Sequence, residues 1–153
     1  MKYWLMKSEP SVYSIDDLKK DRKTCWDGIR NYQARNFMMK DMNPGDLAFF
    51  YHSNCDVIGI YGVMSIYSES YADFSALDKF SKYYDPASTK ENPRWFMVDV
   101  KFERKLKNII TLESLKKYAQ KELLNFKLLA KGNRLSIIPV EEKEWKFILS
   151  LGQ

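Results

Sequence analysis

The sequence predicts one domain of the mixed α+β class: a small sheet or partly closed barrel of about five or six strands with surrounding helices. Short runs rich in aromatic and β-branched residues alternate with segments that carry helix caps and apolar residues at three- and four-residue spacing. The 153 residues are 45% hydrophobic and 29% charged, a balance typical of a globular protein with its own core. No repeat or long linker divides the chain, so we expect residues 1–153 to form a single domain.

The first predicted elements are a strand and a short helix. The apolar run Tyr3–Met6 predicts a strand that runs into a turn at Lys7–Pro10. Ser14, followed by two aspartates, predicts a helix over about residues 15–20, because a serine side chain caps the first turn and acidic residues favour the positive end of the helix. Trp26-Asp27-Gly28 indicates a loop.

A second helix and three strands follow. From Asn31 the apolar residues recur at helical spacing, so we expect a helix whose buried stripe is Ala34, Phe37, Met38 and Met42. A turn at residues 43–46 then leads into a strand, Leu47–His52. Further strands are predicted at Val57–Tyr67, where Gly59 and Gly62 indicate a bend, a bulge or a close backbone approach, and at Trp95–Leu106. The segment between these two strands, residues 73–93, is polar and rich in turns.

The C-terminal part is predicted to be helical around one more strand. Thr111 is expected to cap a helix that reaches Tyr118, and a short turn with three apolar residues follows. Leu135–Val140 predicts a strand, and Glu141–Leu151 a closing helix with an apolar face.

Composition excludes several classes of protein. No apolar run approaches the ~20 residues that cross a bilayer, and no secretion signal is recognisable. We therefore expect a protein without membrane contact that is located in the cytoplasm, including association with the nucleoid. Cys25 and Cys55 fit no zinc spacing and are expected to be reduced thiols. Because His52 is the single histidine, a multi-histidine metal site is impossible, and we expect no bound metal. We also expect a monomer that needs no cofactor.

Positive charge is concentrated in the second half of the chain. The formal net charge is +5, made of about −1 over residues 1–75 and +6 over residues 76–153. Such a basic region can hold a phosphate backbone, although any single lysine is as readily explained as a solvated surface residue. The phosphate-contact candidates are Lys101, Arg104, Lys105, Lys107 and Lys131.

Three segments combine aromatic and polar residues: residues 7–10, residues 24–35 and residues 49–54. A pocket for a planar heterocycle needs an aromatic face for stacking and a few donors and acceptors along the ring edge. Trp26 and Tyr32 can supply the faces, and the edge contacts can come from the backbone and from Asn31, Ser8 and Ser53. The alternative is that the aromatic residues belong to the core and that Asn31 only caps a helix.

The same segments carry a resemblance to a known family. The strings MKYWLMKSEP, YSIDDL, TCWDGIRNYQARNFM, PGDLAFFYHSN, YYDPAS, NPRWFMVDVKF and RLSIIPVEEKEW, in this order from Tyr3 to Leu151, resemble the EVE domain family. The resemblance implies a PUA-like fold, which is a small pseudo-barrel with helices around it, and a protein that binds nucleic acid and accepts a modified base, such as a methylated or hydroxymethylated cytosine. Cys55–Gly59 departs from the family, whose members commonly have a proline before this glycine.

The resemblance also implies a set of ligand-binding residues. They are Ser8, Trp26, Asn31, Tyr32, Arg35, His52, Ser53, Arg134 and Ser136. The main hypothesis is a non-enzymatic reader of a modified base in DNA or RNA, without catalytic residues. One alternative is a small hydrolase of modified nucleosides, related to ASCH amidohydrolases, whose base or nucleophile would be Lys7, Glu9, His52 or a neighbouring carboxylate. Another is a protein-interaction module.

Overall fold

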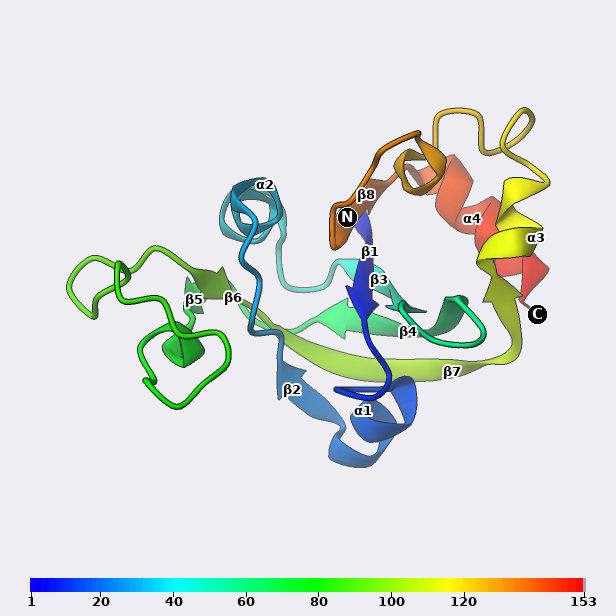
Figure 1. Cartoon of the computed structure of the whole chain (residues 1–153). Coiled ribbons are helices and arrows are strands. Elements are labelled where there is room, and N and C mark those ends of the chain that lie inside the picture. Colours follow the sequence, from blue (N-terminus) through cyan, green and yellow to red (C-terminus); the bar gives the residue numbers. More distant parts are fainter. Residues whose placement is uncertain (153) are drawn as a thin grey trace.

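A curled six-stranded sheet organises the computed structural model, which describes residues 1–152 (Figure 1). Its strand order is β2-β7-β4-β3-β1-β8. The bounds are β1 (Tyr3–Ser8), β2 (Lys23–Cys25), β3 (Leu47–His52), β4 (Gly59–Ile66), β7 (Asp99–Thr111) and β8 (Ile137–Val140). β1 and β3 run parallel and the other pairs are antiparallel, so the sheet is mixed.

Helices and short turns of helix connect these strands. They are α1 (Ile15–Asp21), α2 (Tyr32–Asn36) with a π-helical turn (Phe37–Asp41), α3 (Leu112–Lys116), α4 (Glu142–Leu151) and two 3₁₀ turns (Phe74–Ala76 and Lys127–Leu129). A second, two-stranded sheet pairs β5 (Tyr71–Ala72) with β6 (Phe96–Met97). The predicted α+β class is thereby confirmed. No helix among residues 1–152 is long and apolar enough to cross a membrane.

Local capping signals are confirmed in detail. Ser14 accepts a hydrogen bond from the backbone N–H of Asp17 at 3.1 Å and starts α1. Thr111 caps α3 in the same way. Asn31 caps α2, because its side-chain oxygen accepts the backbone N–H of Ala34 at 3.0 Å. These contacts satisfy N–H groups that the first turn of a helix leaves free.

Three short strands differ from the prediction. β2 and β5 lie in segments for which no element was predicted, and the expected strand Trp95–Leu106 divides at Val98 into β6 and β7. β7 then continues to Thr111, five residues beyond its predicted end. A strand of two or three residues carries too little alternation to be detected in the sequence; it forms because a neighbouring strand offers its edge.

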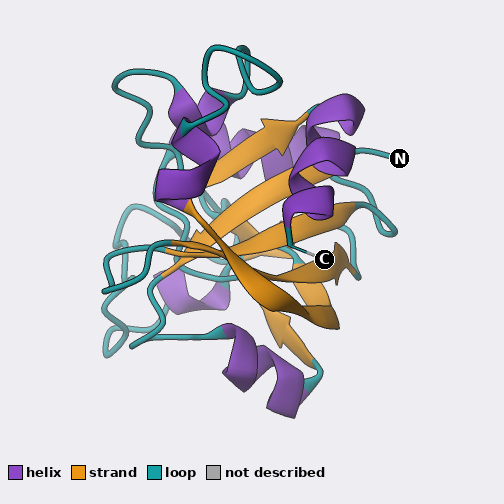
Figure 2. Ribbon diagram, turned by 90° about the vertical axis from the view of Figure 1, so that its right-hand side faces the viewer, coloured by secondary structure: helices purple, strands orange, loops and turns teal. Residues whose placement is uncertain are grey.

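The sheet separates two apolar clusters, one on each face. Alternate residues of one strand belong to different clusters: Trp4 and Met6 lie on one face of β1, and Leu5 on the other. The first face packs on α1, on the segment before α2 and on the methionines that follow it. The second face is covered by α3, α4 and the chain between residues 118 and 129. Figure 2 shows the strands in the middle with helices on both sides.

The predicted irregularity of the fourth strand is also present. The pairing of β4 with β7 shifts register between Ile60 and Gly62. A Cβ added at Gly62 would lie 2.5 Å from the side chain of Ile15, so this glycine allows α1 to approach the sheet closely.

Candidate functional site

A cavity of about 740 Å³ opens where the ends of three sheet segments meet: the end of β1, the strand β2 and the residue after β3. Its size lies within the range of about 300–1,000 Å³ that is usual for small-molecule sites. The lining residues are Lys7, Ser8, Glu9, Val12, Tyr13, Thr24, Cys25, Trp26, Asp27, Gly28, Ile29, Arg30, Ser53, Tyr83, Arg134 and Ser136.

A buried ion pair holds one wall of this cavity. Arg30 Nη1 lies 3.1 Å from Asp73 Oδ2, and the Asp73 side chain is fully buried. The same carboxylate accepts the backbone N–H of Gly28 at 2.9 Å and, through Oδ1, the N–H and hydroxyl of Ser75. The guanidinium also donates to the Tyr83 carbonyl. Because its donors are engaged inside the protein, Arg30 positions the wall and has little capacity left to bind a ligand.

Gly28 allows the aromatic ring of Tyr83 to pack against this wall. Its φ is +81°, and a Cβ built there would lie 2.6 Å from Cζ of Tyr83. A glycine is therefore required twice, for the backbone angle and for the ring that packs on it. This packing places Tyr83 at the cavity although it is 55 residues away in the sequence.

Five of the predicted ligand-binding residues line the cavity. Ser8, Ser53 and Ser136 are brought together by backbone hydrogen bonds, from Ser53 N to Ser8 O at 3.0 Å and from Lys7 N to Ser136 O at 2.9 Å. Arg134 lies at the same cavity. Trp26 is only 7% exposed and forms part of the wall rather than a free platform.

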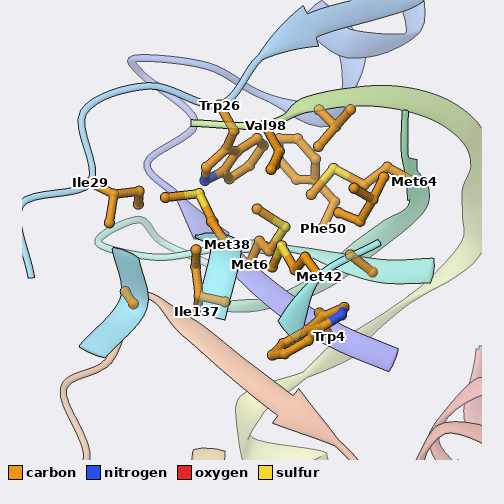
Figure 3. Packing of buried hydrophobic residues seen from close by; sticks show 14 of the residues in the cluster. Trp4, Met6, Trp26, Ile29, Met38, Met42, Phe50, Met64, Val98 and Ile137 are labelled. Atoms are coloured by element: carbon orange, nitrogen blue, oxygen red, sulfur yellow. The ribbon is translucent and has the colours of Figure 1, made fainter. Parts of the chain in front are cut away.

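Trp26 also belongs to the core. Its ring packs edge-on against Phe50 with ring centroids 5.4 Å apart. Figure 3 shows Trp26 at one end of the apolar cluster on the first face, beside Val98. The indole N–H has no hydrogen-bond partner among residues 1–152. Every fully buried polar side-chain atom of these residues does have a partner, so the indole nitrogen is not fully buried. The N–H therefore reaches accessible space, and since Trp26 lines the cavity, we place this free donor at the cavity.

The remaining four predicted residues, Asn31, Tyr32, Arg35 and His52, do not line this cavity. Tyr32 stacks on Trp95 with ring centroids 4.8 Å apart, and the Arg35 guanidinium lies 4.7 Å from the Tyr32 ring. We call Tyr32, Arg35 and Trp95 the outer stack. It is positioned by the Asn31 cap, which starts α2 and sets Tyr32 and Arg35 three residues apart on one helix side. Tyr32 is half-exposed and Trp95 is buried.

His52 is a structural residue of the first apolar face. It is buried, its ring stacks on Tyr61 at 3.8 Å, and its Nε2 accepts the backbone N–H of Ile15 at 3.2 Å. Burial lowers the pKa of His52, and Lys105 adds to this effect while Asp16 opposes it. A neutral imidazole is required to accept this hydrogen bond.

The cavity holds ionisable residues that were not among the predicted ligand-binding set. Burial lowers the pKa of Lys7. Burial raises the pKa of Asp27, and the nearby carboxylate of Asp73 raises it further. Burial and Asp27 also raise the pKa of the Cys25 thiol, which disfavours the reactive thiolate. Both cysteines are free, and residues 1–152 contain no cluster of side chains fit to hold a metal ion.

The basic candidates divide into two groups. Lys131 and Arg134 line a second, polar hollow of about 360 Å³, which shares Arg134 with the main cavity. Lys101, Arg104, Lys105 and Lys107 are exposed along β7. Lys101 stands opposite Lys23, next to the cavity residue Thr24. Lys107 lies roughly 20 Å farther along the strand, and Lys105 is paired with Asp16 at 2.8 Å.

Comparisons with known proteins agree with this fold. The model of the family described as EVE domain matches residues 2–151. Human thymocyte nuclear protein 1 is 47% identical over 166 residues, which cover 97% of this chain and 73% of the relative. A crystal structure of a protein from Pseudomonas syringae has a TM-score of 0.94 at 46% identity and covers 99% of both chains.

A further structure carries a ligand. The crystal structure of human THYN1 protein in complex with DNA containing 5-methylcytosine has a TM-score of 0.94 at 46% identity, covering 100% of this chain and 98% of that chain. These matches confirm the expected PUA-like fold. On the strength of the family model and the identity to its relatives, the chain belongs to the EVE domain family.

Proposed function

We propose that this protein is a reader of modified bases in nucleic acid and that a single base, such as 5-methylcytosine in DNA, enters the cavity beside Trp26. The observation that carries this proposal is a cavity of about 740 Å³ with aromatic and polar walls, in a chain 46% identical to a human protein solved with 5-methylcytosine-containing DNA. A base inside a duplex can reach such a cavity only by leaving the stack, which is easiest for a base that is unpaired or altered.

The walls of the cavity provide what a base needs. Tyr13 and Tyr83 contribute aromatic surface beside the largely buried indole of Trp26, and stacking on such tyrosine rings contributes about 1–3 kcal/mol per base. The indole N–H of Trp26 and the hydroxyls of Ser53 and Ser136 provide polar groups for the ring edge. The Ser8 hydroxyl is already engaged, because it donates to the Tyr13 carbonyl at 2.6 Å.

The phosphate backbone has a suitable place at the second hollow. Neither Lys131 nor Arg134 takes part in an ion pair among the described residues, so their charges are available to a phosphate. Lys101 is the best-placed candidate on β7. Lys107 is too remote to contact the phosphates that flank the bound base, and it serves only a longer nucleic acid.

A hydrolase acting on a modified nucleoside is the second candidate, and one observation favours it. Lys7 and Glu9, two of the three proposed bases or nucleophiles, line the cavity, and the pKa of Lys7 is lowered by burial. A lysine with a lowered pKa is a better base and nucleophile at neutral pH. His52 is a poor candidate for this role because it does not line the cavity and its Nε2 is occupied by Ile15.

Direct binding separates these candidates. Fluorescence anisotropy is measured with matched DNA and RNA oligonucleotides that differ only in carrying 5-methylcytosine or cytosine at one position. We expect tighter binding to the methylated strand, and weaker binding to both strands as salt is raised, because phosphate contacts release counterions. Equal affinity for the two strands would contradict the reader. Release of a hydrolysed product from modified nucleosides, detected by mass spectrometry, would favour the enzyme.

A further inference from the structure

Asp27 is an acidic side chain of the cavity wall that has no protein partner to explain it. It is half-buried and lines the cavity, yet within residues 1–152 it forms no ion pair and no side-chain hydrogen bond with another residue. Glu9, the other carboxylate of the lining, is exposed and accepts a hydrogen bond from Asn54 Nδ2 at 2.5 Å. Asp27 is thus the uncommitted carboxylate of the cavity.

The backbone on both sides of Asp27 is fixed. Trp26 N donates to Val98 O at 2.8 Å, and Gly28 N donates to Asp73 Oδ2 at 2.9 Å. These bonds anchor the loop to Val98, between β6 and β7, on one side and to the buried ion pair on the other. The backbone that carries Asp27 is therefore held in place before a ligand arrives, which reduces the entropy lost on binding.

Holding a carboxylate in this position has a cost. Burial and the carboxylate of Asp73 both disfavour its charged form, while Arg30 and Lys82 partly offset this at a distance. The carboxylate is only half-buried, and no fully buried polar side-chain atom among residues 1–152 lacks a hydrogen-bond partner, so its oxygens reach the open cavity. A ligand that donates a hydrogen bond there would supply a partner that no other residue of the protein provides.

We propose that Asp27 is the residue that makes the cavity specific for a base with an exocyclic amino group, such as cytosine and its 5-methyl derivative. This inference rests on the proposed function. Cytosine presents its N4 amino group as a donor, which a carboxylate oxygen accepts, whereas thymine presents the O4 acceptor at the same position. The two oxygens repel each other, so the same cavity rejects a thymine.

Single-stranded oligonucleotides with 5-methylcytosine or thymine at one position test this directly. Both bases carry the 5-methyl group, so they differ only at the edge that Asp27 would read. The wild-type protein should bind the 5-methylcytosine strand at least about tenfold more tightly than the thymine strand. Asp27→Asn should bring the ratio close to one, because an amide offers a donor as well as an acceptor and can turn to suit either base. Asp27→Ala should weaken binding of 5-methylcytosine more than binding of thymine.

Glu9→Gln is the matched control, because it makes the same chemical change at the other carboxylate of the lining; the wild-type ratio should be retained. Equal binding of 5-methylcytosine and thymine by the wild-type protein, with cytosine bound more weakly, would overturn the role of Asp27 and leave the reader intact. Retention of the full ratio by Asp27→Asn would overturn it as well. Failure to distinguish any of the three bases would contradict the proposed function itself.

Discussion

The ten residues from Trp26 to Arg35 divide into two halves that behave differently. In the inner half, Trp26–Arg30, the side chains line the cavity, and the backbone is tied to Val98 and Asp73. In the outer half, Asn31–Arg35, the asparagine caps α2 and the other two predicted residues form the outer stack with Trp95. The sequence places aromatic rings, arginines and polar groups in both halves, so composition does not distinguish them.

The difference lies in where the polar groups find their partners. Arg30 is bound by a buried aspartate, whereas Arg35 donates to its neighbour Asn36 and to the exposed Arg94 carbonyl. The inner half therefore combines a rigid frame with two unused groups, the Trp26 indole N–H and the Asp27 carboxylate. In the outer half the arginine finds its partners at the surface, and Asn31 borders the second hollow, which Lys131 and Arg134 also line. A polar group that the protein leaves without a partner calls for an explanation, which aromatic content alone does not.

The largest expected effect concerns the two arginines. Arg30→Ala leaves the carboxylate of Asp73 buried without its counter-ion, so we expect the free energy of unfolding to fall by about 3 kcal/mol or more. Arg35→Ala removes a surface cation and should cost less than about 1 kcal/mol. Urea denaturation of both variants measures this contrast. Similar losses for the two would mean that the buried ion pair of Arg30 and Asp73 contributes no more to stability than the outer stack does.

A smaller effect is expected at the glycine of the cavity wall. Gly28→Ala places a side chain at φ +81° and against the Tyr83 ring, whereas Gly132→Ala, at φ +77°, meets no atom within 4 Å. The positive φ alone should cost about 1–2 kcal/mol in each variant. The contact with Tyr83 should add about 1–3 kcal/mol at position 28. Equal thermal or urea stability of the two variants would show that Tyr83 is not held against Gly28.

The smallest effect is a pH dependence of stability that originates at His52, outside the cavity lining. Because the pKa of His52 is lowered in the folded state, the unfolded chain binds more protons near its ordinary pKa of about 6.5. The free energy of unfolding should therefore be highest above this pH and decrease as the pH falls through it. His52→Gln keeps an oxygen that accepts the Ile15 N–H and does not titrate, so its stability should vary less between pH 7.5 and 5.5. An identical pH dependence of both proteins would contradict this.

Local interactions were predictable from the sequence. The caps at Ser14, Asn31 and Thr111 each need only a residue three positions away, and the strand Leu47–His52 has its predicted bounds. The buried stripe of the second helix is also confirmed for Ala34, Met38 and Met42, with Phe37 partly buried, even though the helix changes to a π turn at Phe37.

The division of residues 26–35 was not predictable in this way. It depends on Asp73, Tyr83 and Trp95, which lie more than 40 residues from their partners. Asp73 and Tyr83 belong to a segment whose composition indicated only turns, and Trp95 to the start of a predicted strand. Asp73 gives no signal in the sequence that it is buried. The Asn31 cap was visible, and it was the one sign that the outer half serves the helix.

The four tryptophans allow the central claim to be tested in one measurement. The indole N–H signals are assigned in a ¹H–¹⁵N spectrum and followed as a 5-methylcytosine oligonucleotide is added. We predict that the Trp26 signal shifts most, because its N–H is free and at the cavity, while Trp4 and Trp95 remain bonded to Asp46 and Asp85. Trp145, on the opposite face of the sheet, should not respond. A dominant shift of Trp95 with an unchanged Trp26 would move the binding site to the outer stack and contradict the account.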